Sequence, residues 1–183
     1  MSKYLFLGGH TDEELCFAGT ILKLIEKKHE IDYWAFHPGF TDLKEFFLSM
    51  EILGCNGDVL NQDTLRNAGD FLYRIREKYD IVFTHSVIDR HPMHKMVGEE
   101  SLRIFNQSLI TYIGPWNGNE APNYFVEISE EHLQKKIQAL ACYKSQAHRP
   151  YMNPDFIRSW AVYNGIKAGC KYAESFRIIR KLE

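Results

Sequence analysis

Apolar and polar residues follow a repeating order along the first hundred positions, and this order predicts strands and helices in turn. The apolar run at residues 4–7 ends in Gly8 and Gly9 and predicts a strand buried on both faces. Apolar residues then recur at helical spacing from Leu15 to Ile25. The same unit repeats, with strands predicted at 31–36, 58–60 and 81–84 and helices at 41–53, 64–78 and from Pro92 onward.

The pattern loosens after residue 107. We predict strands at 109–113 and 124–128 and helices at 129–145 and 154–169. Thr41 and Asn153 are expected to cap two of the helices at their N-termini, and Gly54 is expected to end the first of these two. Strands that alternate with helices predict an α/β, Rossmann-like three-layer fold, in which helices cover both faces of a mostly parallel sheet. No linker or repeat divides the chain, so we expect one domain over residues 1–183.

Composition excludes several classes of function. The net charge is −2 and the longest basic cluster is Lys27-Lys28, which is not the pattern of a nucleic-acid-binding protein. No apolar run reaches the length of a membrane span, and the start of the chain does not resemble a signal peptide. The four cysteines form no CxxC pair and are expected to be reduced thiols. These features predict a cytoplasmic protein with no membrane span, and they are compatible with a homo-oligomer.

Two polar clusters follow predicted strands directly. GGHTDEE, residues 8–14, comes after the first strand, and HSVIDRHPMH, residues 85–94, comes after the strand at 81–84. Ligands of open parallel sheets bind outside the carboxyl ends of the strands, where the strand order reverses. If these two strands are neighbours, both clusters line one crevice.

Imidazoles and carboxylates that converge on one crevice indicate a metal. A catalytic zinc takes three protein ligands and keeps one position open. His10, one carboxylate from Asp12 or Glu13, and either His91 or His94 would supply that set. Each part also has a simpler explanation, because carboxylates often complement a helix N-terminus and paired histidines often lie on a solvated face. Four of the eight histidines at two strand ends favour the metal.

These residues resemble a known family. GGHTDEELCFAGT is similar to the His-Pro-Asp-Asp-Glu signature of the PIG-L family, also called LmbE-like, of zinc-dependent deacetylases, and RHPMH is similar to its His-Pro-Asp-His signature. The resemblance extends to a Lys-x-x-Ala...Ser-Gln segment and to a closing Ala-Glu-x-Phe segment. The matching residues are Lys136, Ala139, Ser145, Gln146 and residues 172–176.

The resemblance implies a role for each matched residue. His10, Glu13 and His94 would bind zinc or another divalent metal ion, Asp12 would act as general base and then acid, and His91 would stabilise the oxyanion. Zinc would polarise the amide carbonyl and activate water, and Asp12 would remove a proton from that water. The substrates implied are N-acetylated amino sugars, either free or conjugated to another group.

Three substitutions separate this chain from the family pattern. Thr11 replaces a proline, Glu13 replaces an aspartate, and Met93 replaces the aspartate that supports the oxyanion-stabilising histidine. Asp89 is a candidate to take over that support of His91. The substitutions leave open an alternative, a family member that binds a sugar or a partner without hydrolysis.

Several residues are candidates for contact with a small-molecule substrate. They are Trp116, Asn117, Asn119, Arg149, His37 and His85. Trp116 could stack on a sugar face, and Arg149 could meet a phosphate or carboxylate. It is equally consistent with the sequence that Trp116 packs onto the domain and that His37 and His85 are structural. A nucleotide-binding module is disfavoured because GGHTDE lacks the GxGxxG pattern.

Overall fold

The computed structural model describes residues 1–36, 41–60, 68–116 and 120–182. Its strands are β1 (Lys3–Gly8), β2 (Glu30–Ala35), β3 (Asn56–Val59), β4 (Ile81–Thr84), β5 (Ser108–Tyr112), β6 (Tyr124–Glu127) and β7 (Ala173–Arg180). The α-helices of these ranges are α1 (Ala18–Glu26), α2 (Leu43–Leu53), α4 (Ala68–Ile75), α5 (Pro92–Ile104), α6 (Glu130–Leu140) and α7 (Pro154–Ala168).

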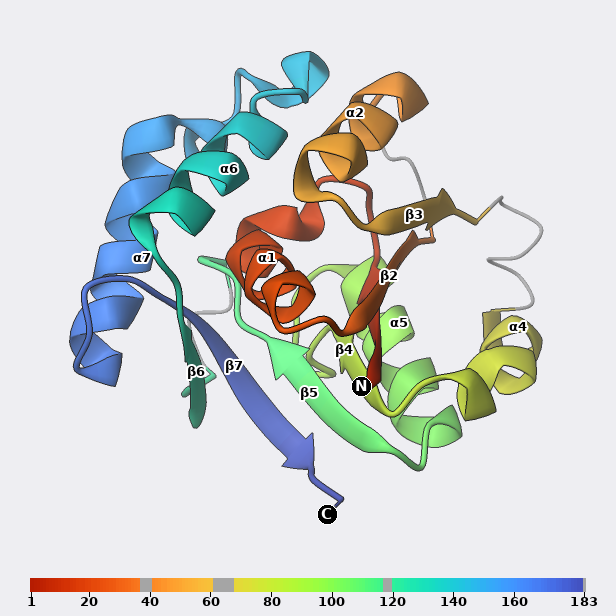
Figure 1. Cartoon of the computed structure of the whole chain (residues 1–183). Coiled ribbons are helices and arrows are strands. Elements are labelled where there is room, and N and C mark those ends of the chain that lie inside the picture. The colour runs from red at the N-terminus through yellow and green to blue at the C-terminus, as the bar shows by residue number, and fades with distance from the viewer. Residues whose placement is uncertain (37–40, 61–67, 117–119, 183) are drawn as a thin grey trace.

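All seven strands belong to one sheet, in the order β3-β2-β1-β4-β5-β7-β6. The first five in this order are parallel, whereas β7 runs antiparallel to both β5 and β6. The chain leaves β1 toward β2 and β3 and later returns on the other side of β1 as β4 (Figure 1). The strand order therefore reverses between β1 and β4.

Helices cover both faces of the sheet, as β1 illustrates. Phe6 packs into a core cluster with residues of α1, α2, α6 and α7, whereas Leu5 and Leu7 pack into a second cluster with residues of α4 and α5. Successive side chains of a strand point to opposite faces, so an uninterrupted apolar run is needed to contact both layers. The predicted α/β fold with a mostly parallel, doubly covered sheet is confirmed.

Two predicted helices differ from the structure at their ends. Asp42, not Thr41, caps α2, because its carboxylate accepts the Lys44 N–H at 2.9 Å. The Thr41 hydroxyl instead contacts the hydroxyl of Thr11. Gly54 ends α2 with a φ of 70°, as predicted. The predicted helix at 129–145 is shorter, since α6 ends at Leu140 and a separate 3-10 turn, Lys144–Gln146, follows.

The antiparallel strand β7 was not expected from the sequence, and its Glu174 places a charged side chain in the core. Glu174 accepts hydrogen bonds from the backbone N–H groups of Gly19 (2.9 Å) and Thr20 (2.7 Å), in the first turn of α1. Its other partner is Lys136 of α6, whose Nζ lies 2.6 Å away. Both charged side chains are about 2% exposed or less. This buried ion pair joins β7, α6 and the N-terminus of α1.

The four cysteines are free thiols. In the part of the chain that the structure describes, no helix combines the length and apolar character that crossing a membrane requires.

Candidate active site

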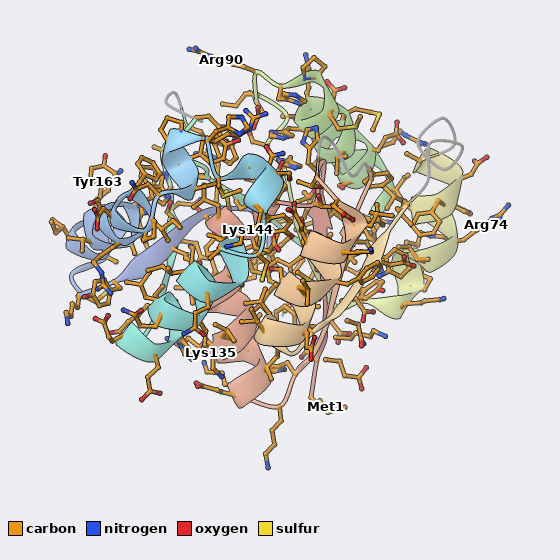
Figure 2. The ribbon with its side chains drawn as sticks, turned by 90° about the horizontal axis from the view of Figure 1, so that it is seen from above. Met1, Arg74, Arg90, Lys135, Lys144 and Tyr163 are labelled. Atoms are coloured by element: carbon orange, nitrogen blue, oxygen red, sulfur yellow. The ribbon has the colours of Figure 1, made fainter. Side chains whose placement is uncertain are left out.

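The two polar clusters lie side by side at the carboxyl ends of β1 and β4. These strands are paired, so the turn after Gly8 and the loop after Thr84 emerge next to each other. The loop after Thr84 carries Arg90, which projects from the end of the molecule opposite Met1 (Figure 2). The predicted crevice therefore lies where the strand order reverses, the usual ligand position of such sheets.

His10, Glu13 and His94 bring three potential ligand atoms together. Nε2 of His94 lies 2.7 Å from Oε1 of Glu13. Nδ1 of His10 lies 3.2 Å from the same Glu13 oxygen and 3.2 Å from Nε2 of His94. His91 belongs to the same cluster, since a ligand atom of its ring, one of His10 and one of His94 all lie within 4.8 Å of one another. These residues come from the turn after β1 and from the start of α5.

Asp89 orients His94 from behind. Its Oδ2 lies 3.1 Å from Nδ1 of His94, and its Oδ1 accepts the backbone N–H of His91 at 2.8 Å. A carboxylate that binds one ring nitrogen of a histidine fixes the tautomer and directs the other nitrogen toward a metal. Asp89 thus contacts the His94 ring and the His91 backbone, whereas the sequence suggested support of the His91 side chain.

The charges of Glu13 and His94 depend on each other. Burial alone would disfavour the charged form of each group, but the attraction between the two opposite charges outweighs this effect. Glu13, together with Asp89, raises the pKa of His94 to about 10. His94 in turn holds the pKa of Glu13 well below its usual range. A cation bound between them would replace the proton of His94 as the partner of the Glu13 carboxylate.

Asp12 and His91 both have shifted pKa values. Burial, followed by repulsion from Glu13, raises the pKa of Asp12 to about 6. Burial and the neighbouring rings of His94 and His10 lower the pKa of His91. At neutral pH, Asp12 is therefore a carboxylate with unusually high proton affinity, and His91 is a neutral imidazole.

Buried hydroxyl groups hold the backbone of the turn that carries these residues. Tyr33 donates to the carbonyl of His10 at 2.8 Å, and Tyr143 donates to the carbonyl of Thr11 at 2.6 Å. Glu14, the third carboxylate of the turn, accepts from Ser49 at 2.7 Å and also contacts Tyr143. Burial raises the pKa of Glu14 to about 8, so this carboxyl group is mostly protonated at neutral pH. Glu14 is part of the support of the turn.

A cavity of about 670 Å³ opens beside the cluster. Its lining includes all five residues to which the sequence assigned catalytic or metal-binding roles, together with Trp116, Arg149 and Tyr151. Trp116 packs edge to face with Tyr151 at 5.7 Å between ring centroids and also covers Gly114. Nε of Arg149 donates to Gln146 at 2.6 Å. The other two predicted substrate contacts, Asn117 and His37, lie outside the described residues, as does Asn119.

Sequence reasoning missed most of the residues that support the site, and it named Asp89 only as a candidate support of His91. Tyr33 is a buried residue of β2, and Tyr143 is a buried residue between α6 and the 3-10 turn at Lys144–Gln146; nothing in their spacing marks them. Glu14 and Asp89 lie within the two polar clusters, so membership of a cluster was a signal that could have identified them. Their partners, the Ser49 hydroxyl and the His94 ring, depend on three-dimensional packing. The support of the candidate metal ligands depends on contacts between segments that are far apart in the sequence.

Comparison with known proteins finds no family model and no curated protein that matches this sequence. Solved structures do match. N,N'-diacetylchitobiose deacetylase from Pyrococcus horikoshii has a TM-score of 0.80 at 24% identity, over 97% of this chain and 84% of that one. The 4-carboxy-2-hydroxymuconate hydratase GalB from Pseudomonas putida KT2440 has a TM-score of 0.80 at 16% identity, over 100% and 98%.

A third structure is the zinc-inhibited form of teicoplanin deacetylase Orf2, with a TM-score of 0.76 at 14% identity and 97% of each chain covered. At these identities the comparison establishes a shared fold. This chain therefore has the α/β fold found in two deacetylases and a hydratase.

Proposed function

We propose that this protein is a zinc-dependent hydrolase that removes the acetyl group from an N-acetylated amino sugar or a conjugate of one. The observation that carries the proposal is the convergence of His10, Glu13 and His94 within 3.2 Å, at a cavity that Asp12 also lines. The resemblance of both polar clusters to deacetylase signatures supports it. The fold alone would not support a deacetylase, because the same fold occurs in a hydratase.

The residues of the site fit a divalent cation. Two imidazoles and one carboxylate are a common ligand set of catalytic zinc. Oε2 of Glu13 is buried and has no hydrogen-bond partner among the described residues, which agrees with a carboxylate whose partner is an ion. His10, Glu13 and His94 would hold the ion, and Asp89 would orient His94. When bound, a zinc ion polarises a substrate carbonyl and lowers the pKa of water.

Asp12 and His91 have the properties that amide hydrolysis requires. A general base works best when its pKa lies near the working pH, and the pKa of Asp12 is raised to about 6. Asp12 takes a proton from the attacking water and later gives it to the departing amine nitrogen. His91 is neutral and exposed, so its ring N–H can donate to the carbonyl oxygen as negative charge develops there.

The cavity suits a sugar with a polar substituent. Trp116 and Tyr151 form an aromatic wall on which the apolar face of a sugar ring can stack. Arg149, held by Gln146, can pair with a phosphate or carboxylate. Asn117 and His37 remain proposed contacts on sequence grounds. A cytoplasmic location is part of the proposal, and the four free thiols agree with it.

One observation favours a second candidate, a protein that binds a sugar without hydrolysis. Met93 stands beside the metal ligands where the deacetylase signature has an aspartate. A thioether gives no electrostatic support to a neighbouring imidazole.

Amine release from a panel of N-acetylhexosamine compounds, measured with zinc present, tests the proposal. Deacetylation of at least one compound, lost on chelation and restored by zinc, is the expected result. Binding of those compounds without amine release would instead establish the second candidate.

A further inference from the structure

His85 is a buried histidine that lies between the two elements that supply the metal ligands. It is 1% exposed and follows β4 directly. The turn that carries His10 lies on one side of it and α5, with His94, on the other. No catalytic or metal-binding role follows for it from the deacetylase signatures.

A hydrogen bond ties His85 to the turn. The backbone N–H of Gly9 donates to Nε2 of His85 at 2.8 Å. A ring nitrogen that accepts a hydrogen bond carries no proton, so the ring is neutral and its proton is on Nδ1. Gly9 directly precedes His10, so this bond fixes the backbone from which the first metal ligand projects.

Stacking ties the same ring to α5. The rings of His85 and His94 lie parallel, with centroids 3.9 Å apart and an angle of 14°. Tyr112 also packs against the His85 ring, edge to face, with centroids 4.5 Å apart. The His94 ring thus stacks on the His85 ring and is bonded to the Asp89 carboxylate, and these two contacts leave it little rotational freedom.

Two glycines allow this close packing. A Cβ atom at Gly98 of α5 would lie 2.6 Å from the carbonyl oxygen of His85. At Gly9, a Cβ atom would lie 2.9 Å from Cδ2 of His94 and 3.3 Å from Nε2 of His85. Real Cβ atoms do not approach other atoms to 2.6 or 2.9 Å, so the close packing of α5 and the turn around His85 requires that both positions lack a side chain.

We propose that His85 is a positioning residue, which sets the separation of His10 and His94 by accepting the Gly9 N–H while stacking on the His94 ring. The inference rests on the proposed function, because it assumes that these two histidines bind the ion. Outer residues that orient metal ligands commonly contribute 10–100-fold, in rough terms, to metal affinity. His85 acts through the ligands, and it is not among the described residues that line the cavity beside the cluster.

Two substitutions distinguish the contribution of the hydrogen bond to Gly9 from the contribution of the stacked ring. His85→Phe keeps an aromatic ring and removes the acceptor, whereas His85→Gln places an amide oxygen where Nε2 now lies. Zinc affinity is measured by competition with a chromophoric chelator, and the visible spectrum of the Co²⁺-loaded protein reports the ligand geometry. Urea unfolding of the metal-free proteins reports stability separately. His132→Phe is the matched control, because His132 is also buried and its Nδ1 also accepts a backbone N–H, that of Ser129 at 3.2 Å.

We expect His85→Phe to weaken zinc binding by about 10–100-fold and to change the Co²⁺ spectrum. His85→Gln should restore most of the affinity, and His132→Phe should leave the affinity and the spectrum unchanged. If His85→Phe does not fold, His85→Asn replaces it, since an Asn side chain is too short to reach the Gly9 N–H. Parental affinity and spectrum in both His85 variants, even with a lower urea midpoint, would reduce His85 to a structural role and overturn the inference.

The same measurements distinguish this inference from the proposed function. A parent protein that binds zinc but releases no amine refutes the hydrolase, while the comparison of His85 variants still decides the role of His85. A parent protein that binds no divalent ion refutes both. An active parent whose His85 variants bind zinc as tightly as it does refutes only the role of His85.

Discussion

The carboxylate of Asp89 lies 3.1 Å from Nδ1 of His94, on the side of the ring that faces away from Glu13. This contact determines which nitrogen of His94 is available in the crevice. A histidine held in this way has one tautomer and one orientation, so it needs little rearrangement to bind an ion.

His94→Ala should abolish metal binding. The parent protein, purified with zinc present, is expected to hold about one divalent ion per chain, as a site with three protein ligands does. Removal of His94 leaves His10 and Glu13 as the two remaining members of the proposed ligand set, and metal content measured by elemental analysis should fall to background. His29→Ala is the control, because the ring of His29 accepts the Ser2 N–H at 3.1 Å and precedes the first residue of β2, at the end of the sheet opposite the cluster. Equal metal content in His94→Ala and the parent would show that His94 is not a ligand.

Asp12→Asn should keep the fold and the metal and lose the activity. The amide is nearly the same size as the carboxylate but cannot accept a proton, so hydrolysis should fall by roughly 100-fold or more. Asp42→Asn is the control, since Asn also caps a helix and Asp42 lies at the start of α2. Initial rates at equal metal content make the comparison. A parental rate in Asp12→Asn would exclude Asp12 as the base.

The rate of hydrolysis should decrease on the acid side as Asp12 becomes protonated. Asp12 accepts a proton only when it is ionised, and burial and Glu13 raise its pKa to about 6. A bound divalent cation favours the ionised form and lowers this pKa, so the acid limb should have its midpoint at or below about pH 6. The test is a profile of initial rates against pH with metal content checked at each point. A midpoint above pH 7 would contradict the assignment.

Lys136→Met should destabilise the protein strongly. It leaves the buried charge of Glu174 without its partner, and the loss of one member of a buried ion pair typically costs about 3–5 kcal/mol. The free energy of unfolding in urea, with metal removed, gives the measurement. Lys135 is the matched control, because it precedes Lys136 in α6 but points into solvent (Figure 2), and Lys135→Met should change stability by at most about 0.5 kcal/mol. Similar losses in both variants would contradict a special role for the buried pair.

The parallel part of the fold was predictable because each of its strands and helices has its own local pattern. The run at residues 4–7 became β1, and the strand predicted at 81–84 coincides with β4. β7 was missed because it breaks the alternation of strands and helices, and its sequence, AESFRIIR, puts a charged residue into the core. Glu174 is tolerated there only because Lys136 and the first turn of α1 surround it, and no local pattern shows those contacts.

The candidate site was predictable as far as its residues come in clusters. Position after two neighbouring strands indicated His10, one carboxylate from Asp12 or Glu13, and either His91 or His94, whereas the choice of Glu13 and His94 came from the resemblance to the deacetylase signatures. The roles of Asp89 and His85 depend on individual contacts, Asp89 with Nδ1 of His94 and the Gly9 N–H with Nε2 of His85. Residue spacing does not determine such contacts. The suggestion that Asp89 supports the His91 side chain came from chain proximity, whereas packing directs its carboxylate to the His94 ring.

The bond between Glu174 and Gly19 spans 155 residues, which sets an order of events during biosynthesis. The ribosome releases the turn of His10 and Glu13 first, but the helix behind that turn gains its buried acceptor only when β7 has emerged. Until then the first N–H groups of α1 lack their protein partner. If the protein binds zinc as proposed, the nascent chain should therefore acquire the ion late, after nearly all of the fold has been synthesised, and a chain interrupted before residue 174 should not retain it.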